Sequence, residues 1–115
     1  MGTRSLVIVL ALLLCGAGAS AAQKSSAKTR KPVTHTVTVD ATSFRPATLT
    51  IAPGDTVVWN NKDVIPHTAT SKKPAVFDSG TIASGKSWKH TFKTAGNLAY
   101  VCQFHPTMTG NIIVK

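Results

Sequence analysis

The sequence predicts an all-β fold, a small Greek-key β-sandwich of about seven to eight short strands. Runs of β-branched and aromatic residues recur at short spacing, and turn signals separate them about every 8 to 12 residues. No window of about a dozen residues holds helical periodicity, and proline and glycine interrupt the chain too often for long helices.

The expected strands follow one another from residue 33 onward. The segment VTHTVTVD alternates valine and histidine with threonine, which predicts one buried face carrying Val33, His35, Val37 and Val39. Leu49 then alternates with threonines ahead of a Pro-Gly turn. Further strands are expected at 57–59, 87–94, 97–104 and 110–115.

Several single residues in these strands have a structural interpretation. We expect Trp59 and Trp88 to be core aromatic residues, and we expect His35 and His90 to be structural or solvated rather than functional. Gly54 and Gly110 are interpreted as turn residues.

Residues 1–22 have the pattern of a secretory signal peptide. Arg4 precedes an apolar run over 6–14, and small residues follow, with cleavage expected after Ala21 or Ala22. The run is too short to cross a bilayer core of about 30 Å, so no transmembrane span is expected in the mature form. We therefore predict an exported, periplasmic protein.

The number of cysteines determines whether the mature chain can form a disulfide. Cys15 resembles a lipoprotein acylation site, but the leucine before it matches poorly, and an ordinary signal-peptide cysteine is the favoured interpretation. Cleavage leaves Cys102 as the one cysteine of the mature chain, so no intramolecular disulfide is possible in an oxidising compartment. The thiol is then either buried and inert, or occupied.

The mature chain is strongly basic. Removal of Arg4 leaves 12 Lys and Arg against four aspartates, a formal net charge of about +8. Residues 23–32 form a basic segment that we expect to be a disordered linker, and residues 33–115 form the folded domain. The charge favours anionic partners, and the exported compartment excludes nucleic acid.

The stretch VCQFHPTMTG places Cys102, His105 and Met108 at every third position. Pro106 restricts His105 toward extended backbone, so these residues are expected on a tight turn at the rim of the sandwich. Three donors make an incomplete metal site, and the best candidate for a fourth is His67, which follows a proline in DVIPHTATS.

Two imidazoles, one thiolate and one thioether favour a particular metal. Soft sulfur donors select copper, and two histidines with a cysteine and a weak axial methionine are typical of electron-transfer copper sites. Zinc would prefer a tetrahedral set without methionine. We therefore predict one type 1 copper ion.

These residues resemble the type 1 blue copper proteins of the cupredoxin family, in the amicyanin, pseudoazurin and plastocyanin group. The resemblance rests on CQFHPTM and on the stretch from Phe44 to Trp59, FRPATLTIAPGDTVVW, and it covers residues 34–115. It implies copper bound by His67, Cys102, His105 and Met108, cycling between Cu(I) and Cu(II).

Two positions depart from the pattern of that family. Thr68 stands where several relatives have asparagine, and its hydroxyl is expected to substitute for the amide. Phe104 stands where amicyanin has proline. Both changes alter the surroundings of the ligands, which tune the reduction potential.

The resemblance also implies that His105 is the electron port. An apolar rim is expected around it from Pro66, Phe104 and Pro106, and nearby lysines are expected to steer acidic docking surfaces of redox partner proteins. We expect a monomeric electron carrier and no enzyme activity. The alternative is a copper-binding or copper-delivery protein that does not shuttle electrons.

Overall fold

The chain is described by a computed structural model that covers Gly2 and residues 30–115. Apart from Gly2, the predicted signal peptide lies outside the described residues, as do residues 23–29 of the predicted linker. Residues 31–115 form one folded unit. Its strands are β1 Thr34–Asp40, β2 Ser43–Arg45, β3 Thr48–Ile51, β4 Thr56–Asn61, β5 Thr70–Ser71, β6 Ser87–Thr91, β7 Gly96–Cys102 and β8 His105–Val114.

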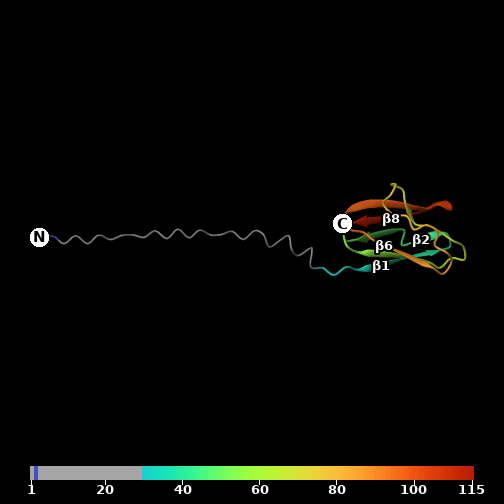
Figure 1. Ribbon diagram of the computed structural model, residues 1–115, viewed down its shortest axis with the longest axis horizontal. Helices are drawn as coiled ribbons and strands as arrows, with labels where there is room; N and C mark the ends of the chain where they lie inside the picture. Colours follow the sequence, from blue (N-terminus) through green and yellow to red (C-terminus); the bar gives the residue numbers. More distant parts are fainter. Residues whose placement is uncertain (1, 3–29) are drawn as a thin grey trace. The chain divides into compact units, whose positions relative to one another are not determined.

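Two four-stranded sheets form the two layers of this unit (Figure 1). One sheet has the order β2-β1-β4-β6 and the other β3-β8-β7-β5. The pairs β1–β4 and β3–β8 are parallel and the remaining pairs are antiparallel. The predicted β-sandwich of seven to eight strands is confirmed, and β2 and β5 are short strands that the sequence pattern did not indicate.

Strand β1 buries one face, as its alternation predicts. Val37 and Val39 are fully buried, and their threonine neighbours are not. The prediction was wrong for Val33, which precedes β1 and is 44% exposed. Its backbone N–H donates to the buried carboxylate of Asp55, so this end of the strand is fixed by a polar contact and not by burial of the valine.

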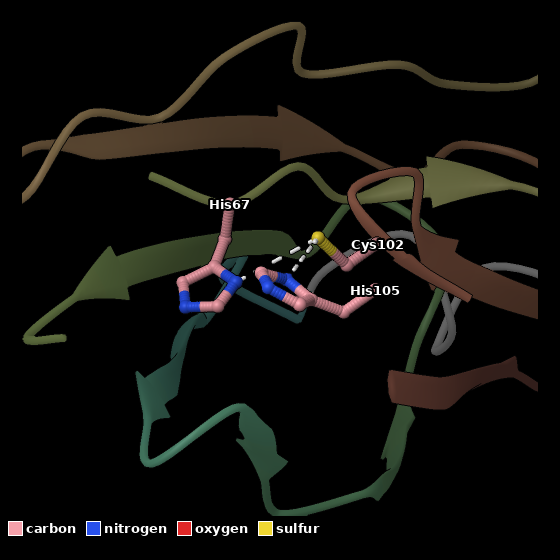
Figure 2. Close-up of side chains that lie close together, drawn as sticks. All are labelled: His67, Cys102 and His105. Carbon is pink, nitrogen blue, oxygen red and sulfur yellow. Dashed lines mark hydrogen bonds between the residues drawn. The ribbon is translucent and has the colours of Figure 1, made fainter. Parts of the chain in front are cut away.

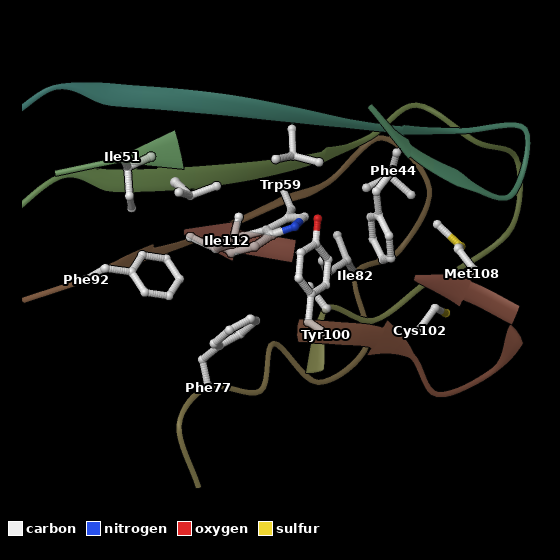
Figure 3. Packing of buried hydrophobic residues seen from close by; sticks show 14 of the residues in the cluster. Phe44, Ile51, Trp59, Phe77, Ile82, Phe92, Tyr100, Cys102, Met108 and Ile112 are labelled. Carbon is white, nitrogen blue, oxygen red and sulfur yellow. The ribbon is translucent and has the colours of Figure 1, made fainter. Parts of the chain in front are cut away.

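Aromatic residues fill the space between the sheets (Figure 3). Trp59 lies at the centre with its ring centroid 5.5 Å from those of both Tyr100 and Phe77. Trp88 is partly buried against the core, with its ring tilted against Trp59 and stacked on Phe77, so both tryptophans are core residues as predicted. Burial raises the pKa of Tyr100 to about 12.

Both histidines that were predicted to be structural have structural contacts. His35 Nε2 lies 3.0 Å from Asp55 Oδ2 on the neighbouring segment. The ring of His90 stacks on Trp88 and meets Phe92 edge to face, and burial lowers the pKa of His90 below the usual value.

In the part of the chain that the structure describes, no helix has the length and apolar character to span a membrane.

Gly54 and Gly110 differ in what they contribute. Gly54 has φ of 95° and makes a turn, as predicted. Gly110 was wrongly predicted as a turn residue, because it lies within β8 opposite Tyr100. A Cβ at Gly110 would come within 2.3 Å of Cζ of the Tyr100 ring, so a glycine is needed there to seat the tyrosine.

Gly110→Ala is expected to destabilise the domain by about 1–3 kcal/mol, because the added methyl forces the fully buried Tyr100 ring to move. Urea unfolding measures the effect. Gly96→Ala is the matched control, since a Cβ at Gly96 meets no atom within 4 Å. Equal stability of the two variants would contradict the assigned role of Gly110.

Candidate metal centre

A break in the pairing of β7 with β8 shapes the end of the sandwich where the predicted ligands lie. Val101 pairs with Thr109, so an unbroken antiparallel ladder would next pair Cys102 with Met108. Instead, Cys102 pairs with His105 after a register shift. The shift of three residues therefore brings both His105 and Met108 beside the same cysteine.

The turn between the two strands is shorter than the sequence suggested. Only Gln103 and Phe104 form it, and β8 begins at His105. The predicted extended backbone at His105 is confirmed. The prediction that Met108 lies on the turn was wrong, because β8 continues through it to the C-terminal region.

Three of the four predicted ligands meet at this end of the molecule. Figure 2 shows the side chains of His67, Cys102 and His105 pointing toward one another. Cys102 Sγ lies 3.6 Å from His67 Nδ1 and 3.8 Å from His105 Nδ1, and one donor atom from each residue lies within 4.8 Å of the others. This is the grouping expected for donors that share one ion.

The ring of His67 is oriented from behind by Asp63, a residue that the sequence analysis missed. His67 Nε2 lies 2.9 Å from Asp63 Oδ2, and His67 is fully buried. An Nε2–H that donates to this carboxylate leaves Nδ1 as the lone-pair nitrogen facing Cys102. This hydrogen bond lowers the pKa of Asp63. An acidic residue close to a candidate ligand histidine is the sequence signal that would have found it.

Asp63 is itself held in place by its neighbours. Thr42 N–H donates to Oδ2 at 3.1 Å, and Val64 N–H donates to Oδ1 at 2.8 Å. Its backbone carbonyl accepts from the Ser84 hydroxyl at 2.6 Å. Asp63 is thus fixed by contacts to two other segments of the chain, those of Thr42 and Ser84, and by the backbone of the next residue.

The thiol of Cys102 is fully buried, yet its surroundings favour the thiolate. Burial raises the pKa of Cys102, but the backbone N–H groups of Thr68 and Phe104 and the neighbouring imidazoles of His105 and His67 outweigh it and lower the pKa to about 6. The Thr68 N–H donates to Sγ at 3.3 Å. The thiolate is the form that binds metals.

Met108 lies close to this group at the end of the hydrophobic core. It is 3% exposed, and Figure 3 shows its side chain at the same end of the core as Cys102. Phe92 lies toward the opposite end of the core in that view.

Comparison with known proteins places the chain in a family. Residues 5–114 match the family model described as a cupredoxin-like domain. The chain is 31% identical over 125 residues to amicyanin from Paracoccus versutus, an alignment that covers 97% of this chain and 95% of that protein. This chain belongs to the cupredoxin-like family. The blue copper resemblance predicted from the sequence is confirmed.

Two further comparisons agree with the cupredoxin assignment. The chain is 36% identical over 84 residues to chloroplastic plastocyanin from Tetradesmus obliquus, covering 63% of this chain and 58% of that protein. The solved structure of a purple cupredoxin from Nitrosopumilus maritimus superposes with a TM-score of 0.66 at 28% identity. That superposition covers 70% of this chain and 99% of that one.

Thr68 connects the two ligand-bearing segments of this cupredoxin. Besides the backbone contact to Cys102, its side-chain Oγ1 accepts a hydrogen bond from Gln103 N–H at 2.9 Å. Thr68 is 2% exposed. The hydroxyl therefore holds the turn after Cys102 against the segment that carries His67, which is the substitution for an asparagine that the sequence analysis expected.

The donor set of this cupredoxin fits a copper ion. Two atoms bound to one first-row metal ion at about 2.0–2.3 Å lie no more than about 4.6 Å apart, and both sulfur–nitrogen separations satisfy this limit. One thiolate with two imidazoles, and a thioether close by, is the donor chemistry that selects copper.

Exposure separates His105 from its neighbours in the site. His67 and Cys102 are fully buried, while His105 is partly exposed. The adjoining apolar residues are exposed as well, and we call them the apolar rim: Val64, Ile65, Pro66, Phe104 and Pro106. The sequence analysis named three of them and missed Val64, at 87% the most exposed large hydrophobic residue of the described chain, and Ile65.

Thr68→Val is expected to lower the free energy of unfolding of the metal-free protein by about 1–3 kcal/mol, because the Gln103 N–H loses its acceptor. Urea unfolding measures this loss. Thr68→Ser keeps the hydroxyl and should retain most of the stability. A valine variant as stable as the unmodified chain would show that the hydroxyl does not connect the two segments.

Proposed function

We propose that this chain is a periplasmic one-electron carrier in which His67, Cys102, His105 and Met108 bind a single type 1 copper ion. The observation that carries the proposal is the convergence of one thiol and two imidazole nitrogens within 4.8 Å at one end of a cupredoxin sandwich. Similarity to amicyanin and plastocyanin supports an electron carrier. Copper bound here supplies the one-electron Cu(I)/Cu(II) couple.

The protein contributes a site whose side chains are fixed by contacts of their own. Asp63 orients His67, backbone N–H groups point at the Cys102 sulfur, and Thr68 joins the two segments. Ligands held in this way move little when the charge of the site changes, so the reorganisation that accompanies each electron transfer stays small. This preorganisation favours a carrier.

The same contacts bear on the alternative of copper delivery. A delivery protein must release its metal to an acceptor, whereas two of the proposed ligands are fully buried here and Met108 nearly so. Release would require the segments joined by Thr68 to separate. Burial of the donors therefore favours retention of the ion through many redox cycles.

Electrons are proposed to enter and leave through His105. It is the one proposed ligand that is partly exposed. Phe104 and Pro106 of the apolar rim flank it in the sequence, and the other three rim residues directly precede His67. Small apolar patches suit transient redox encounters. The net positive charge of the chain favours partners with acidic docking surfaces. We propose that the protein acts as a monomer and that the isolated chain catalyses no reaction.

Copper loading is expected to give a Cu(II) protein with intense visible absorption from thiolate-to-copper charge transfer, and Cys102→Ser should abolish that absorption. Visible spectroscopy of the oxidised proteins makes the measurement. Lys89→Gln, which changes an exposed residue of β6, serves as the control. A colourless Cu(II) form of the unmodified chain would refute the proposal.

Retention of the metal distinguishes the carrier from the delivery protein. The loaded chain is expected to keep its copper through repeated chemical reduction and oxidation in the presence of a competing copper chelator, as followed by metal analysis after each cycle. Stoichiometric loss of copper within one cycle would favour delivery.

Phe104→Ser is expected to slow electron exchange with a redox partner by roughly tenfold, because it removes the side chain of the rim that adjoins His105, while the visible spectrum keeps its intensity. Stopped-flow kinetics measures the exchange. Val33→Ser removes a similarly exposed apolar side chain away from the rim and should leave the rate unchanged. A slowing by both variants would argue against docking at the rim.

A further inference from the structure

A second feature lies at the end of the sandwich opposite the proposed copper site. A hollow of about 420 Å³ opens between the segment that follows β6 and the start of β7, with two residues of the 72–86 segment on its other side. Strand β7 runs from this hollow to Cys102, a length of roughly 20 Å at about 3.3 Å per residue. The volume of the hollow lies within the range of about 300–1,000 Å³ typical of small-molecule sites.

The lining of this hollow is positively charged. Lys73 and Lys93 line it, and neither lysine side chain makes an ion pair or hydrogen bond with another described residue. No acidic side chain is among the described residues that line it. His90 also lines it, and in the described structure its side chain makes only ring contacts. Two unpaired cations with no counter-charge favour an anionic occupant.

The rest of the lining combines polar residues, Thr91, Thr94 and Asn97, with an apolar part. Val76 is 37% exposed although it is a valine, Phe92 belongs to the core, and Leu98 is partly buried against the core. Transfer of apolar surface from water onto such walls is favourable in proportion to the area covered. A fully hydrated inorganic anion would leave these walls exposed, so the occupant must carry an apolar portion as well as a negative charge.

We propose that this hollow binds a small amphiphilic monocarboxylate, such as a medium-chain fatty acid anion, with the carboxylate beside Lys73 and Lys93 and the hydrocarbon against Val76, Phe92 and Leu98. The concave shape favours a small molecule over a flat anionic surface. Because the hollow and His105 lie at opposite ends of the domain, the ligand leaves the apolar rim free. The proposal does not depend on the proposed copper function.

Binding is tested with sodium octanoate added to the full chain, followed by NMR of backbone amides and of the His90 ring protons. Saturable shifts confined to residues 73–76 and 90–98 are expected. Acetate, which has the same charge without the chain, should bind at least about tenfold more weakly. 1-Octanol, which has the chain without the charge, should bind about three- to tenfold more weakly.

Two double variants with equal loss of charge locate the site. Lys73→Gln/Lys93→Gln is expected to weaken octanoate binding about three- to tenfold. Lys62→Gln/Lys86→Gln removes two lysines that do not line the hollow and should leave the affinity unchanged. Val76→Asp places a carboxylate on the wall of the hollow and should abolish binding.

Three results would overturn the proposal. Shifts confined to the apolar rim would show that octanoate binds there instead. Equal weakening by both double variants would show that the anion responds only to net charge. Binding of acetate as tightly as octanoate would show that the hollow does not recognise an apolar chain.

Discussion

The three-residue register shift between β7 and β8 is the constraint on which the proposed site depends. Up to Val101 and Thr109 the two strands form a regular antiparallel ladder. Beyond that pair, residues 106–108 of β8 lie between Thr109 and His105, and His105 is the residue that pairs with Cys102. A regular hairpin would place one residue of β8 beside the cysteine. The shift places a buried thioether residue and a partly exposed imidazole at that end of β8, and a single strand pair thus carries three of the four proposed ligands.

His67 comes from a different part of the chain, and two contacts determine its position. Asp63 fixes the ring from behind, and Thr68 fixes the backbone against both Cys102 and the turn that follows it. In each of these hydrogen bonds at least one partner, His67 or Thr68, is buried, so breaking the bond would leave a buried polar group without compensation. The position of the fourth donor is therefore as well determined as those supplied by the strand pair, although 35 residues separate His67 from Cys102.

The sequence predicted the residue types of the site better than the contacts that support it. His67, Cys102, His105 and Met108 were recognisable because soft donors at short spacing are rare and chemically distinctive. Asp63 was missed because its role depends on a contact across a loop, which no periodicity reveals. Gly110 was misinterpreted for a similar reason, since a glycine in a strand is needed only when a particular ring, here that of Tyr100, lies over it. The roles of Asp63 and Gly110 both depend on contacts with residues on other segments of the chain.

Exposure and charge are distributed differently around the proposed electron port. The residues of the apolar rim are uncharged, and the nearest acidic group, Asp63, is engaged by His67 and by two backbone N–H groups. Two lysines, Lys73 and Lys93, lie instead at the hollow between β6 and β7, away from His105. Charge at a distance speeds the approach of an acidic partner, whereas an uncharged contact surface adds little electrostatic attraction that would slow departure. A carrier that must bind and release a partner in each cycle benefits from separating these two effects, and the arrangement of the rim and the lysines does so.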